Sequence, residues 1–128
     1  MVDAGLEFLE SLAERGGHTD YTSFCRQVRT KADVALEPGD HALSHLLGAI
    51  ARRSYDSRGV VVTALVHYKD QGFDPGPGFY GICQQLGLLP SGGLSDDTKL
   101  VFLARHQTDL ERAYRRARRD KTTQRNES

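Results

Sequence analysis

Residues 58–80, RGVVVTALVHYKDQGFDPGPGFY, contain the most apolar stretch of the chain and decide its expected fold. Nearly every residue from Gly59 to Val66 is apolar, and three of them are consecutive valines. β-Branched residues favour strands over helices. A short run without polar alternation is typical of a strand covered on both faces. We therefore predict a buried strand over residues 59–66, in the middle of a small sheet centred on residues 59–67. The expected fold class is α+β, a mostly helical single domain built on this sheet.

A glycine- and proline-rich segment follows and must end this strand. In residues 75–78, Pro-Gly-Pro-Gly, the prolines fix φ and the glycines permit positive φ. Helical spacing then predicts a helix over residues 79–86 that ends at Gly87. Its apolar stripe is Phe79, Ile82, Cys83 and Leu86. Backbone N–H groups at the start of such a helix suit a phosphate or carboxylate, so anion binding at residues 75–78 is an open alternative.

Four more helices are predicted from a capping residue followed by an apolar stripe. The expected caps are Asp3, Thr19 or Asp20, Asp40, and Ser95. The stripe of the first helix is Leu6, Leu9, and Leu12 or Ala13. The stripe of the second helix is Tyr21, Phe24, Cys25 and Val28. The stripes of the other two are Leu43, Leu46, Leu47 and Ile50, and then Leu100, Leu103, Leu110 and Tyr114. We expect the helix from Asp40 to end at Arg53, with a polar turn over 54–59, and we expect residues 34–36 to form a minor strand beside the central one.

Length and composition predict one globular domain over residues 1–119 and a disordered polar tail over residues 120–128. The chain of 128 residues is 38% hydrophobic, which suffices for a modest core. It has no apolar run of 18 or more residues and no secretory pattern at its start. We therefore expect a cytoplasmic protein without a membrane partner. Cys25 and Cys83 fall on apolar stripes and are expected to be buried free thiols.

Charge is balanced overall but unevenly distributed. The chain has 17 basic and 17 acidic residues, yet residues 111–128 hold seven basic side chains against three acidic ones. Four of these arginines recur at i, i+3, i+4 and i+7 and form one basic stripe: Arg112, Arg115, Arg116 and Arg119. An exposed stripe of this kind suits phosphate groups.

Three helices followed by a strand and a glycine- and proline-rich loop are similar to a winged helix-turn-helix. TDYTSFCRQV (19–28) and HALSHLLGAI (41–50) resemble helices in the DNA-binding domain of alkyltransferase-like proteins, over about residues 19–75. A winged helix has a return strand after the wing, whereas residues 79–86 are helical in pattern. The Pro-Cys-His-Arg motif of that family is absent, so none of its chemistry is carried over.

The winged-helix resemblance implies a recognition helix over residues 40–53. On this helix His41, Ser44 and His45 would approach bases, while Arg52 and Arg53 would contact phosphates. The alternative is a solvated helix face, since Glu37 and Asp40 lie close by and repel phosphate.

Catalysis is the least favoured class. The chain has no nucleophile elbow, phosphate loop or metal motif. His67-Tyr68-Lys69 places histidine where a metal-dependent nuclease would have an acid. We expect no catalytic residues, no cofactor and no metal ligands. The predicted function is a small binding or regulatory module that acts on nucleic acid. The alternative is a protein-interaction or inhibitor module from a phage or a bacterial defence system.

Removal of residues 120–128 is expected to leave the fold intact, because the segment is polar and lacks an apolar stripe. Thermal unfolding of the shortened and full chains measures this. A loss of several degrees in melting temperature would show that the segment packs on the domain.

Overall fold

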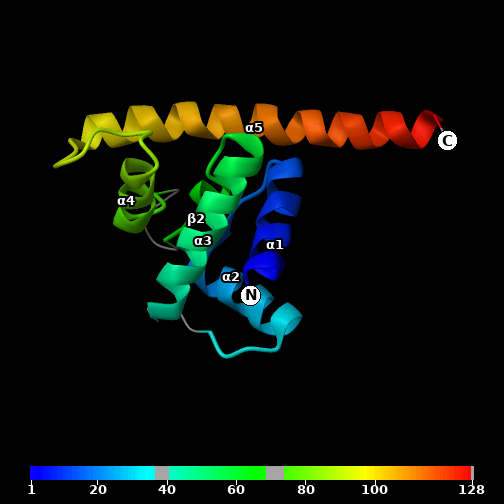
Figure 1. Cartoon of the computed structure of the whole chain (residues 1–128), viewed down its shortest axis with the longest axis horizontal. Coiled ribbons are helices and arrows are strands. Elements are labelled where there is room, and N and C mark those ends of the chain that lie inside the picture. The colour runs from blue at the N-terminus through cyan, green and yellow to red at the C-terminus, as the bar shows by residue number, and fades with distance from the viewer. Residues whose placement is uncertain (37–40, 69–73, 128) are drawn as a thin grey trace.

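The computed structural model describes residues 1–36, 41–68 and 74–127, with side chains described as far as Arg115 in the last helix. In chain order these residues form α1 (Val2–Glu14), β1 (Thr19–Asp20), α2 (Tyr21–Ala32), α3 (His41–Arg58), the 3₁₀ helix η1 (Val62–Leu65), β2 (Val66–His67), α4 (Pro77–Gln85) and α5 (Asp96–Glu127). Figure 1 shows α5 lying across one side of the other helices and continuing beyond them. The chain is mostly helical with a small two-stranded sheet, as predicted.

The valine-rich segment lies at the centre of the core. Val61, Val62 and Val66 are fully buried, and η1 packs against α1, α3 and α5. The predicted burial is therefore confirmed for residues 60–64 and for Val66, whereas Gly59 is exposed and Leu65 is half-buried.

The predicted strand over residues 59–66 is wrong in its hydrogen bonding. Only Val66–His67 form a strand, and Val62–Leu65 turn as a 3₁₀ helix. Helices surround most of the segment, so no neighbouring strand is available to pair with it. Side chains bind its peptide groups instead. The Val61 N–H donates to Nε2 of His106 at 2.8 Å, and the Val62 N–H donates to Oγ of Ser54 at 3.0 Å.

The partner predicted for the central strand is also wrong. Residues 34–36 form no strand. The strand β2 pairs instead with β1, in parallel, with Thr19 opposite Val66 and Asp20 opposite His67. Leu36 is nevertheless fully buried, and its carbonyl accepts a hydrogen bond from Nη1 of Arg29 at 3.1 Å. Residues 34–36 are thus held by a side chain, and the short sheet joins β1 to β2.

The first two helices form as their apolar spacing predicts, but the predicted cap of the first is wrong. α1 begins at Val2, so Asp3 lies within its first turn. Leu9 and Phe24 are fully buried. α1 ends before Gly16, whose φ of 69° lies in the left-handed region that glycine tolerates. At the start of α2, the Asp20 side chain accepts the Ser23 N–H at 2.7 Å, which confirms Asp20 as the cap.

The predicted end of α3 is wrong. The helix continues through Arg58 and stops at Gly59, where φ is 72°. The sequence of these five residues is polar enough to resemble a turn. In the helix, Ser54 alone among them is buried. The predicted cap, Asp40, lies outside the described residues.

The helix predicted over residues 79–86 is confirmed as α4, and Gly87 ends it. Gly87 has φ of 80°, and its N–H donates to the Gln84 carbonyl at 3.1 Å. The next N–H, of Leu88, donates to the Cys83 carbonyl at 2.9 Å. This pair of hydrogen bonds satisfies carbonyls that the helix end leaves open.

The last helix, α5, begins where predicted but buries a partly different set of residues. The Ser95 hydroxyl accepts the Thr98 N–H at 3.1 Å, so Ser95 caps the helix. Leu103, Leu110 and Tyr114 are buried as expected. Leu100 is 67% exposed, which contradicts its predicted place in the stripe. His106, which was not predicted, is buried in the core.

The helix α5 extends as far as Glu127. Its C-terminal part projects past α1 and α3, and the C-terminus lies at the far end of the molecule (Figure 1). The predicted disorder of residues 120–128 stays a prediction that truncation tests. Among the described residues, every helix is too short or too polar to cross a membrane.

Replacement of Ser54 by alanine should lower the free energy of unfolding by about 1–3 kcal/mol, because it leaves the buried Val62 N–H without an acceptor. Urea unfolding measures the loss. Ser57→Ala is the matched control, since Ser57 lies exposed on the same helix. Equal effects of the two substitutions would contradict the role given to Ser54.

His106 should make stability depend on pH. Burial lowers its pKa, and Asp109 opposes this shift to a smaller extent. The unfolded chain therefore takes up a proton at a pH where the folded chain does not, so stability is full above the unfolded pKa of about 6.5 and falls as the pH drops below it.

Urea unfolding between about pH 7.5 and pH 5.5 measures this dependence. His106→Gln, which does not titrate, should show a flatter profile than the wild type. His45→Gln serves as control because His45 is exposed. If His106→Gln kept the full pH dependence, another group would be responsible.

Candidate binding surface

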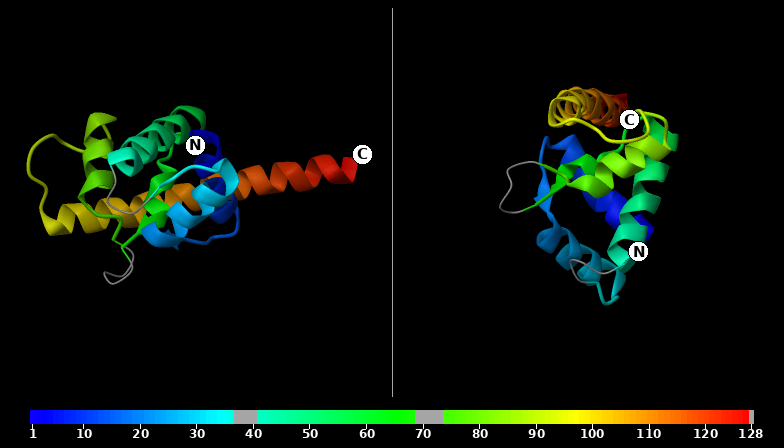
Figure 2. Two further views of the ribbon diagram at one scale, coloured as in Figure 1. Left: turned by 90° about the horizontal axis from the view of Figure 1, so that it is seen from below. Right: turned by 90° about the vertical axis from the view of Figure 1, so that its left-hand side faces the viewer.

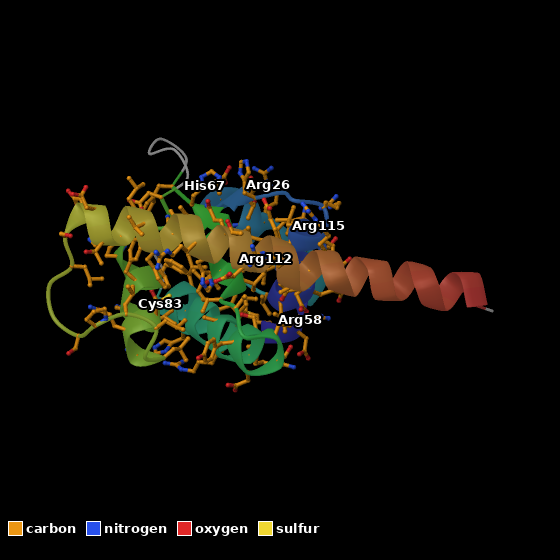
Figure 3. The ribbon with its side chains drawn as sticks, turned by 90° about the horizontal axis from the view of Figure 1, so that it is seen from above. Arg26, Arg58, His67, Cys83, Arg112 and Arg115 are labelled. Atoms are coloured by element: carbon orange, nitrogen blue, oxygen red, sulfur yellow. The ribbon has the colours of Figure 1, made fainter. Side chains whose placement is uncertain are left out.

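Two of the four predicted stripe arginines have described side chains, and both are exposed. Arg112 and Arg115 lie on the side of α5 away from buried Leu110 and Tyr114. Figure 3 shows both of them on α5 in the view from above. The side chains of Arg116 and Arg119 lie outside the described set. The predicted exposure of the stripe is therefore confirmed at Arg112 and Arg115.

The Arg115 guanidinium is only weakly engaged within the chain. Its Nη2 lies 3.9 Å from a carboxylate oxygen of Glu111, and both side chains are more than 60% exposed. Exposed pairs at this helical spacing contribute little to stability. The charge of Arg115 thus remains available to a partner.

Arg52 and Arg53, the phosphate-contacting residues predicted on α3, bind side chains of neighbouring helices. Arg52 donates from Nη2 to Oε1 of Gln85 on α4 at 2.9 Å. Nη1 of Arg53 pairs with a carboxylate oxygen of Asp3 on α1 at 2.5 Å. Both arginines are exposed, but they join α3 to its neighbours.

The predicted base-contacting residues, His41, Ser44 and His45, are exposed at the start of α3. Figure 1 shows that this end of α3 points away from α5, whereas the other end reaches it. The predicted base-contacting residues on α3 therefore lie away from the arginine stripe on α5. The described strands pair in parallel and include no return strand. Residues 69–73, where a wing would begin, lie outside the described ranges, so the winged-helix resemblance stays a prediction.

The start of α4, which was considered for anion binding, holds an acid of the chain itself. The Asp74 carboxylate accepts the Gly76 N–H at 3.0 Å. Burial, together with the nearby Asp74 to which its hydroxyl is hydrogen-bonded, raises the pKa of Tyr80 to about 12. The Tyr21 hydroxyl donates to the carbonyl of Pro75. A bound anion would face the Asp74 carboxylate, so the structure disfavours this alternative.

A pair of histidines that was not predicted lies beside the small sheet. Nδ1 of His18 is 2.8 Å from Nε2 of His67, and the rings are 4.9 Å apart between centroids. Nδ1 of His67 lies 3.0 Å from the Tyr68 carbonyl, which can only accept, so this nitrogen carries a proton. In the neutral ring Nε2 of His67 is then the acceptor, and His18 donates to it.

The histidine pair borders a pocket of about 210 Å³. Gln107 and Glu111 of α5 add an amide and a carboxylate to its lining, and Leu110 adds an apolar side chain. No group of three or more metal-ligating side chains comes together among the described residues. The arrangement offers a small molecule several hydrogen-bonding groups beside an apolar side chain. Sequence gave no signal of it, since His18 and His67 are 49 residues apart.

Cys25 and Cys83 are buried thiols that take part in no disulfide of the described residues, as predicted. Burial raises the pKa of the Cys83 thiol to about 12. A thiol with such a pKa stays protonated at neutral pH, and the thiolate is the nucleophilic form. Cys83 is therefore a protonated thiol that packs in the core.

Comparison with known proteins adds no further constraint on the site. No protein-family model matches the chain, and neither a curated protein nor a solved structure matches it.

Proposed function

We propose that the protein is a small non-catalytic binding module that contacts the phosphate backbone of nucleic acid through the second half of α5. The observation that carries the proposal is the exposure of Arg112 and Arg115 on one side of a helix that runs beyond the domain. Guanidinium groups on an exposed helix face bind phosphates without reading bases.

The sequence of the projecting segment supports this proposal. Residues 112–125 hold seven arginine or lysine residues and one acid, Asp120. Beyond Tyr114, whose hydroxyl donates to Glu10 of α1, the helix continues past α1 and carries the remaining charges away from the domain. A duplex approaching the end of α5 thus meets positive charge before it meets the acidic part of the domain.

A protein partner is the second candidate, and a separate observation favours it. Leu100 is 67% exposed and Val101 is 53% exposed, and they are neighbours on α5. Adjacent exposed apolar side chains suit a protein contact better than a phosphate contact. This pair lies in the first half of α5, apart from the arginines.

Affinity for duplex DNA should fall with salt, because each phosphate contact adds about −0.9 to the slope of log affinity against log salt concentration. If four arginines bind, the slope is about −3 to −4. Arg112→Ala with Arg115→Ala should reduce its magnitude by about 2. Fluorescence anisotropy with a labelled duplex at several salt concentrations gives the slope.

Arg26→Ala is the matched control, since Arg26 is an exposed arginine on a different helix, α2. It should leave the slope unchanged. Absence of binding to DNA and RNA duplexes at about 50 mM salt, at high micromolar protein, would reject the proposal and leave the protein-interaction candidate.

A further inference from the structure

The pocket beside the histidine pair lies where the end of α1, η1, β2 and α5 meet, and its volume is about 210 Å³. Ala13, Ala64 and Leu110 give it apolar walls, and the rings of His18 and His67 border it. Figure 2 shows these elements from two further sides. Sites for drug-sized ligands measure roughly 300–1,000 Å³. The smaller volume found here therefore suits a ligand with a single ring system.

Two side chains of α5 decide which hydrogen bonds the pocket can make. The Glu111 carboxylate only accepts, whereas the Gln107 amide both donates and accepts. The two residues are four apart and are thus neighbours on one side of the helix. An anion inside the pocket would face the carboxylate, and the described residues bring no three metal-ligating side chains together. These groups suit a neutral ring with apolar faces and hydrogen-bond donors along one edge.

A positive charge lies one helical turn beyond this carboxylate. Arg115 follows Glu111 by about 6 Å along the helix axis, and both side chains are exposed. Figure 3 shows Arg115 and His67 on the same side of α5. A ligand with its ring in the pocket and a phosphate at the rim would therefore meet a guanidinium at the phosphate.

Guanine matches this set of groups better than the other nucleobases. Its Watson–Crick edge carries two adjacent donors, N1–H and the N2 amino group, and a carboxylate accepts two parallel hydrogen bonds. The neighbouring O6 accepts from an amide such as that of Gln107. Adenine and cytosine place one donor beside one acceptor on this edge, and uracil and thymine place one donor between two acceptors. Guanine alone thus uses both oxygens of Glu111.

We propose that this pocket binds a guanine nucleotide, with the base hydrogen-bonded to Glu111 and Gln107 and the phosphate on Arg115. The base lies against the imidazole rings at the border of the pocket, since histidine rings stack on base faces. A guanine within a duplex uses the same edge for its own base pair. The ligand is therefore a free nucleotide or an unpaired guanine of a single strand. The inference goes beyond the proposed function and shares only Arg115 with it.

Titration with mononucleotides, followed by NMR, tests the choice of base. Guanosine monophosphate (GMP) should bind. Inosine monophosphate (IMP), which lacks only the N2 amino group, should bind about tenfold more weakly, because one hydrogen bond to a charged group is lost. Adenosine monophosphate should also bind more weakly than GMP. A lack of GMP binding at millimolar concentration, or equal affinity for GMP and IMP, overturns the proposal.

Glu111→Gln tests the carboxylate. The new amide offers one acceptor and one donor, so the preference for GMP over IMP should disappear. Glu111 is exposed, so the melting temperature should stay close to that of the wild type. Asp56→Asn is the matched control, because Asp56 is an exposed acid of α3 that does not line the pocket. A Glu111→Gln variant that still prefers GMP would show that the base does not contact this carboxylate.

The ratio of GMP to guanosine affinity tests the phosphate contact. The wild type should bind GMP more tightly than guanosine, and Arg115→Ala should bind the two alike. Arg105→Ala is the control, because Arg105 is an exposed arginine of the same helix that does not line the pocket. An unchanged ratio in Arg115→Ala contradicts the place given to the phosphate.

A short single strand with one guanine distinguishes the two sources of the base. Tighter binding of this strand than of GMP identifies an unpaired guanine of a strand as the ligand, and equal or weaker binding identifies a free nucleotide. Glu111→Gln retains every arginine, so its salt slope for duplex DNA should match that of the wild type. If duplex binding is absent while GMP binds, only the proposed function fails. If GMP binding is absent while the duplex binds, only the guanine proposal fails.

Discussion

The fold depends on how the peptide groups of the buried valines are satisfied. A segment this apolar must lie inside, but its N–H groups need acceptors there, because an unpaired buried N–H is costly. Ser54 from α3 and His106 from α5 provide two of these acceptors. The Ser54 hydroxyl also bonds to the carbonyls of Ala51 and Val60. The core is therefore held to two helices by polar atoms as well as by packing.

Much of this architecture could be predicted from spacing alone, because burial follows apolar pattern. The helices α1, α2 and α4 and the burial around Val62 are of this kind. The hydrogen-bonding state of the valines could not be predicted, because it depends on Ser54 and His106 from elsewhere in the chain. His106 did carry a signal, since it follows Leu103 by three residues and precedes Leu110 by four. The predicted burial of Leu100 was wrong because the neighbouring Lys99 takes the side of α5 that faces the domain. Its Nζ lies 5.5 Å from the Tyr80 ring centroid.

The surface was harder to predict than the core. Exposure of Arg112 and Arg115 followed from the opposite placement of Leu110 and Tyr114, so that part succeeded. The contacts of Arg52 and Arg53 could not be predicted from the sequence. Their partners, Gln85 and Asp3, come from helices distant in the chain. The His18–His67 pair needed the parallel register of β1 and β2, which local sequence does not encode. Contacts between residues far apart in the chain therefore set the limit of prediction.

The contact between α1 and α5 also has a consequence for synthesis on the ribosome. Tyr114 of α5 donates its hydroxyl hydrogen bond to Glu10 of α1 across 104 residues, and the two helices pack together. At about 5–20 residues per second, α1 emerges roughly 5–20 s before its partner exists. During that time the apolar stripe of α1 and the valine segment lack the cover that α5 will provide. These apolar surfaces of the nascent chain are thus exposed to water until α5 is made.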